Sequence, residues 1–165
     1  MSKKQDYLDV LNHEHATTLK VLRAYPADKM DLQPHPKAKS ARDLAWMFVI
    51  EQGFAAKGAS EGFDWSVPPA PFPPAPATMN EIIAALIEGH KKVVGAVNNL
   101  SDADITQTIK FFTGPQQISD VPKIQFLWMV LHDQIHHRGQ LSVYLRMADG
   151  KVPSIYGPSL DEPWF

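Results

Sequence analysis

Residues 119–150, SDVPKIQFLWMVLHDQIHHRGQLSVYLRMADG, decide the fold, because their pattern predicts one long helix. Apolar residues recur along one face at helical spacing: Phe126, Val130, Leu141 and Tyr144. We place the start of the helix at about Ser119–Pro122, with the proline in its first turn, and its end at Asp149, where Gly150 follows. Three of the seven histidines fall well inside this helix.

Three more helices are predicted upstream, over residues 4–24, 40–58 and 78–99. A capping box, Thr78-Met-Asn-Glu81, starts the last of these. Residues 100–118 are expected to form a loop or a short hairpin. Four long helices without convincing β-alternation predict an all-α fold, in the form of a four-helix bundle.

The connection between the second and third helices is rich in proline. Six prolines fall between Pro68 and Pro76, which excludes a helix interior and a central strand. We expect a stiff, extended crossover over residues 59–77, held to the body of the protein by Phe63, Trp65 and Phe72. A linker between two domains is the alternative. We predict a single domain over residues 1–165, since neither half has enough helix to close a core.

The composition of the chain argues against several kinds of site and partner. The chain has no cysteine, so disulfides and thiolate sites are excluded and any metal must use nitrogen and oxygen ligands. The polar N-terminus predicts no signal peptide, and no apolar run approaches the ~20 residues of a membrane span. A net charge of −2 argues against a nucleic-acid partner. We therefore expect a soluble cytoplasmic protein.

The segment from His132 to Gln140 concentrates the chemistry of the chain. Residues four apart share a helix face, so two pairs of potential metal ligands arise: His132 with His136, and Asp133 with His137. The second pair lies on the apolar face, where an unpaired carboxylate is costly, and is therefore the better candidate for a metal site. Without a metal, Asp133 and His137 would bond each other, or Arg138 and Glu51, in a buried polar network.

Several motifs resemble those of the DinB-like proteins, which belong to the DinB/YfiT-like metalloenzyme superfamily. The matching stretches are His136-His137-Arg138-Gly139-Gln140-Leu141, Tyr144-Leu145-Arg146, Val152–Ser159, His13–Thr18 and Pro34-His35-Pro36. The resemblance implies a four-helix bundle, often a homodimer. It also implies a divalent metal, nickel or zinc, held by a histidine of the second helix and an i,i+4 pair of the fourth.

Carried onto this sequence, the resemblance places the helix-four pair at Asp133 and His137, with aspartate where histidine is usual. The helix-two ligand falls on Met47, whose thioether is a poor ligand for zinc or nickel beside a carboxylate. Glu51, one helical turn further, and His15, on the apolar stripe of the first helix, are the candidates for the missing third ligand.

Two functions follow. In the first, the protein is a metal-dependent transferase or hydrolase acting on a small thiol or electrophile. Asp133 and His137 then hold the ion, Glu51 is a ligand or general base, and Tyr156 and Arg138 line the pocket and orient the substrate.

In the second, the protein is a non-catalytic, damage-inducible dimeric bundle whose metal site has degenerated. Trp128, Leu131 and Ile135 form a second apolar face on the fourth helix. That face must be buried, either centrally or at a subunit interface.

Overall fold

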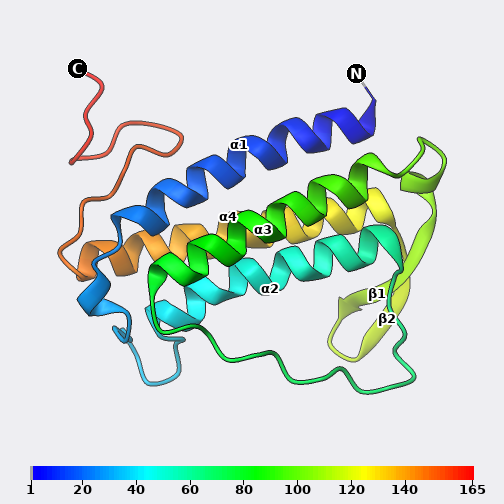
Figure 1. Ribbon diagram of the computed structural model, residues 1–165, viewed down its shortest axis with the longest axis horizontal. Helices are drawn as coiled ribbons and strands as arrows, with labels where there is room; N and C mark the ends of the chain where they lie inside the picture. The colour runs from blue at the N-terminus through cyan, green and yellow to red at the C-terminus, as the bar shows by residue number, and fades with distance from the viewer. Residues whose placement is uncertain (1) are drawn as a thin grey trace.

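The computed structural model describes residues 2–165, which form four long helices and one small antiparallel sheet (Figure 1). The helices are α1 (Lys3–Ala24), α2 (Ala41–Ser60), α3 (Met79–Asn98) and α4 (Lys123–Met147). The sheet consists of β1 (Thr108–Gly114) and β2 (Gln117–Pro122), and short 3-10 turns lie at Ala27–Lys29 and Asp104–Thr106. The mostly helical fold is as predicted, and the sheet is an addition to the all-α prediction.

The four helices pack along their lengths. α2 contacts α3 and α4, and α1 contacts the same two helices from the other side. Each helix therefore has two helical neighbours. Figure 1 shows the proline-rich crossover running back along this body, from the end of α2 to the start of α3. The predicted capping box at Thr78 and Glu81 is present, with both reciprocal hydrogen bonds.

The hairpin explains why α4 begins later than predicted. Residues 119–122 belong to β2, where Val121 pairs with Ile109 of β1, and Pro122 becomes the N-cap of α4. The apolar spacing continues through this stretch, so periodicity alone does not reveal where strand pairing ends. Of the two alternatives for residues 100–118, the hairpin is correct.

Aromatic contacts fasten the crossover to the hairpin and to α2. The Trp65 indole donates a hydrogen bond to the carbonyl of Lys110, at 2.8 Å. The rings of Phe63 and Phe72 each lie 5.7 Å from the ring of Phe54. These contacts confirm the anchoring role predicted for the three aromatic residues of the crossover.

The second apolar face of α4 is covered largely within the chain. Leu131 is buried, and the Trp128 ring packs edge-on against Tyr7 of α1 at 5.3 Å. The two apolar faces of α4 are therefore covered largely by other elements of the same chain. Among residues 2–165, no helix combines the length and apolar character needed to cross a bilayer.

Candidate metal centre

The apolar core is divided into two clusters, and polar side chains occupy the level between them. On α2, Phe48 belongs to one cluster and Ala55 to the other. On α4, Leu131 and Leu141 are divided in the same way. We call the residues between them the polar layer: Glu14, His15, Glu51, Gln52, His90, Gln134, His137 and Arg138. Because burying polar groups without partners is costly, their contacts indicate what the layer does.

Three residues of α2 and α4 converge at one side of this layer. Glu51, Asp133 and His137 each offer one ligand atom, and the three atoms lie within 4.8 Å of one another. Asp133 and His137 are one turn apart on α4, while Glu51 faces them from α2. Glu51 is buried, His137 is partly buried and Asp133 is exposed. The cluster is therefore anchored in the interior and open toward solvent at Asp133.

Glu51 and His137 have unsatisfied polar atoms. Oε1 of Glu51 lies 2.6 Å from Nδ1 of His137, which is within ion-pair distance, although the two groups are not aligned as a hydrogen bond. Both carboxylate oxygens and this ring nitrogen are buried and have no hydrogen-bond partner among the described protein groups. One imidazole nitrogen and two carboxylates form a ligand set that zinc and nickel accept. The residues present therefore fit a divalent metal ion.

The charges of the cluster also favour a bound cation. Burial raises the pKa of Glu51, and the nearby Asp133 carboxylate adds to the increase while His137 opposes it. The contact with Glu51 raises the pKa of His137, against the effect of burial. Two carboxylates face one imidazole, so a bound cation would offset the excess negative charge.

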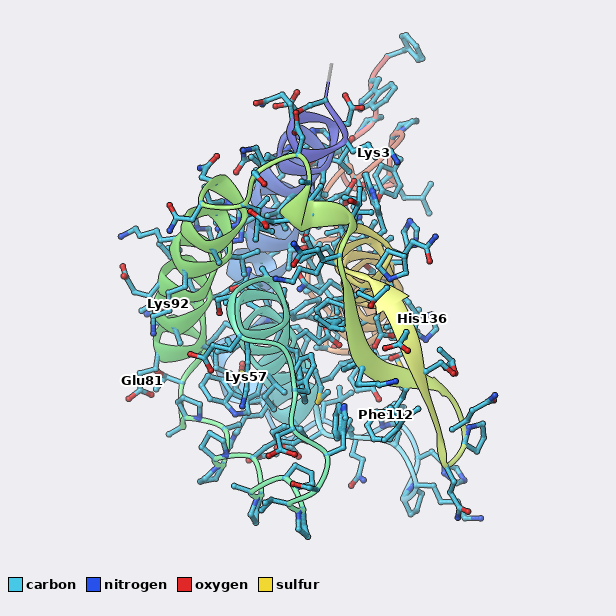
Figure 2. All side chains as sticks on the ribbon, turned by 90° about the vertical axis from the view of Figure 1, so that its right-hand side faces the viewer. Lys3, Lys57, Glu81, Lys92, Phe112 and His136 are labelled. Carbon is cyan, nitrogen blue, oxygen red and sulfur yellow. The ribbon has the colours of Figure 1, made fainter. Side chains whose placement is uncertain are left out.

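A cavity of about 580 Å³ adjoins the cluster. Its polar lining comes from Glu51, Asp133 and the second histidine pair of α4, His132 and His136. Figure 2 shows His136 on the outer side of α4. Helix spacing had placed these two histidines away from Asp133 and His137, and the structure puts both at the cavity while leaving them exposed.

Met47 also lines this cavity, one turn before Glu51 on α2. The residue at the expected ligand position therefore does border the site, although it carries a thioether. Of the two candidates for the third ligand, the structure brings Glu51 into the cluster. His15 lies elsewhere in the polar layer, where its ring stacks on His90 with 3.9 Å between centroids.

Tyr156 and Arg138 form a separate cluster with α1. Nη1 of Arg138 lies 2.6 Å from a carboxylate oxygen of Glu14, and the Tyr156 hydroxyl donates to the same oxygen at 2.8 Å. Nη2 of Arg138 also bonds this hydroxyl. Neither Arg138 nor Tyr156 is among the residues that line the cavity. They tie the C-terminal tail to α1 and α4.

Sequence reasoning missed Glu14 as the partner of Arg138. The residue lies inside the quoted His13–Thr18 motif, and an acidic residue with less than a tenth of its surface exposed requires a compensating charge. The sequence does not reveal this burial, because helix spacing does not specify which face of α1 meets α4.

The model of the DinB family matches residues 1–164. The chain belongs to the DinB family. Among curated proteins, it is 29% identical over 120 residues to the uncharacterized protein YrdA of Bacillus subtilis, a match that covers 72% of this chain and 67% of YrdA.

Two solved DinB-like structures share the fold of this DinB-family chain. One, from Bacillus cereus ATCC 10987, has a TM-score of 0.74 at 24% identity and covers 92% of this chain and 97% of its own. The other, YjoA of Bacillus subtilis, has a TM-score of 0.70 at 15% identity, with 97% and 99% covered. At these identities the likeness concerns the fold.

Proposed function

We propose that this DinB-family protein is a metal-dependent enzyme, a transferase or hydrolase that acts on a small thiol or electrophile. Glu51, Asp133 and His137 would hold one divalent ion, nickel or zinc. The observation that carries the proposal is the convergence of Glu51, Asp133 and His137 beside a cavity, where the Oε2 atom of Glu51 is buried and has no partner among residues 2–165.

When bound, the metal would lower the pKa of a coordinated water or thiol and so supply a nucleophile. The protein would contribute placement and proton transfer. Glu51 and His137 hold the ligand atoms on two packed helices, while Asp133 is accessible from the cavity. The imidazoles of His132 and His136 line the same cavity, where they could exchange a proton with a bound substrate.

A second function has its own support. Met47 replaces an imidazole at the position implied by the resemblance, and Glu51 and His137 already approach to 2.6 Å. Both observations favour a non-catalytic, damage-inducible four-helix bundle with a degenerate site. A homodimer in the cytoplasm is the assembly and location we propose in either case.

Metal titration of tag-free protein separates the two functions. Metal analysis followed by calorimetry with zinc and nickel should give one ion per chain, and Asp133→Asn and His137→Gln should each abolish or greatly weaken binding. His13→Gln, which removes an exposed histidine of α1, should bind like the wild type. Absence of stoichiometric binding in the wild type would overturn the enzyme proposal and leave the non-catalytic bundle.

A further inference from the structure

We infer that the substrate of this site carries an apolar group of aromatic size, which packs into the cavity beside the metal ligands. The position of the substrate's reacting end rests on the proposed function. The position of its apolar group rests on the cavity alone. A volume of about 580 Å³ suits a small molecule and is far too small for a folded partner.

The cavity walls are apolar away from the ligand cluster. Met47 and Phe54 come from α2, Met129 and Val130 from α4, and Phe111 from the hairpin. The polar lining, in contrast, belongs to α2 and α4 only, at Glu51 and the segment His132–His136. A ligand that fills the space therefore has its polar end at the carboxylates and its apolar part among thioether and aromatic side chains.

The hairpin wall is held rigidly, so the apolar space is preformed. The Phe111 ring lies 4.7 Å from the ring of Phe126 on α4 and 5.2 Å from the ring of Phe63 in the crossover. Phe54 joins the same cluster, with its ring 6.4 Å from that of Phe111. Because three chain segments fix this wall, little ordering is needed when an apolar group binds.

The two methionines provide adjustable contact surface. Met47 is partly exposed between the buried residues Leu44 and Glu51 of α2. Met129 is 40% exposed near the start of α4. Both line the cavity. Flexible, polarizable thioethers are well suited to contact a planar aromatic group. A methionine at position 47 thus extends the apolar wall to the edge of the ligand cluster.

Two hydroxamates with the same metal-binding end test this inference. Binding of 4-fluorobenzohydroxamate and acetohydroxamate is measured by calorimetry on zinc-loaded protein, and the fluoroaryl compound is also followed by fluorine NMR on EDTA-treated protein. We expect the aryl compound to bind zinc-loaded protein at least roughly tenfold tighter, because the phenyl ring is removed from water. It should also bind detectably without zinc.

Matched variants locate the ring. Met129→Gln and Phe111→Ala should remove most of the aryl preference. Met147→Gln, at an exposed methionine of the same helix, and Phe112→Ala, at the exposed neighbour of Phe111, should retain it, since neither residue lines the cavity. Circular dichroism and thermal unfolding identify any variant that fails to fold, and Met129→Gln, on the helix surface, keeps the test valid if Phe111→Ala does not fold.

The outcomes distinguish this inference from the proposed function. If zinc binds but the two hydroxamates bind equally well, or if Met129→Gln leaves the aryl preference intact, the inference is wrong and the metal site stands. If zinc alone does not bind while the fluoroaryl signal persists and is lost in Met129→Gln, the metal proposal fails and the apolar subsite stands.

Discussion

Glu51 of α2 and His137 of α4 approach to 2.6 Å between Oε1 and Nδ1, yet neither atom has a hydrogen-bond partner. Even as an ion pair, this contact leaves the second carboxylate oxygen of Glu51 buried and without a partner in the part of the chain that the structure describes, which is costly in a helical core. A third species that both can ligate would relieve it. This relationship between two helices is the basis for the predictions on metal binding.

Replacing Glu51 by glutamine tests the carboxylate while keeping its shape. Loss of a direct anionic ligand should weaken zinc binding by more than the roughly 10–100-fold that loss of an outer-shell partner costs. The metal-free variant should be at least as stable as the wild type, because burial already raises the pKa of this carboxyl group. Zinc calorimetry and urea unfolding in EDTA measure the two effects. Unchanged zinc affinity would remove Glu51 from the ligand set.

Restoring an imidazole at position 47 should strengthen the site. Met47 lines the cavity one turn from Glu51, so Met47→His adds a fourth potential ligand and should raise zinc affinity at least roughly tenfold. Met147→His places the same group at an exposed position of α4 and should have no effect. Competition with a chelating dye gives both affinities. Equal affinities in the two variants would contradict the proposed placement of the site.

We expect the free energy of unfolding to decrease at acidic pH because of the histidines in the polar layer. Burial lowers the pKa of His15 to about 4, with smaller contributions from the charges of His90 and Arg23. Between about pH 6.5 and 4 the unfolded chain therefore binds a proton at this residue that the folded chain does not. Unfolding free energy should decrease as pH falls through that window, by on the order of 1 kcal/mol once partial exposure is considered.

Urea unfolding in EDTA at several pH values measures this dependence. In His15→Gln the slope of stability between pH 6.5 and 4 should be shallower than in the wild type. Above pH 6.5 the residue is neutral in both states, so its contribution to the slope disappears there. An identical slope in the variant would show that other groups cause the loss of stability between pH 6.5 and 4.

The pair formed by Arg138 and Glu14 should matter for stability and not for metal binding. Arg138→Leu leaves the Glu14 carboxylate buried without its partner at 2.6 Å, and should destabilise the protein by about 3–5 kcal/mol. Tyr156→Phe removes two hydrogen bonds, to Glu14 and from Arg138, from a residue that is 62% exposed, and should cost only about 1–2 kcal/mol. Zinc affinity of Tyr156→Phe should equal that of the wild type. A large loss of zinc binding in this variant would instead show that Tyr156 contributes to the metal site.

The helices and two of the three residues of the ligand cluster were accessible from sequence because they depend on local spacing. The i,i+4 geometry of one helix places Asp133 and His137 together. Apolar phase predicted that both turn inward, which holds for the partly buried His137 and is wrong for the exposed Asp133. Glu51 was one of two candidates, because the position of α2 against α4 decides which residue reaches the cluster. Phe111 could not be predicted as a wall of the cavity, since its place depends on where the hairpin folds back against α4.

The polar layer between the two core clusters also determines how the helices are aligned. If α4 slid by one turn, about 5.4 Å, Arg138 would enter a zone of leucines and Glu14 would face no cation. An apolar core alone would tolerate such slippage far better, because one leucine can replace another. The charged and aromatic groups of the polar layer therefore favour a single longitudinal register of the helices. They do so whether or not an ion is bound.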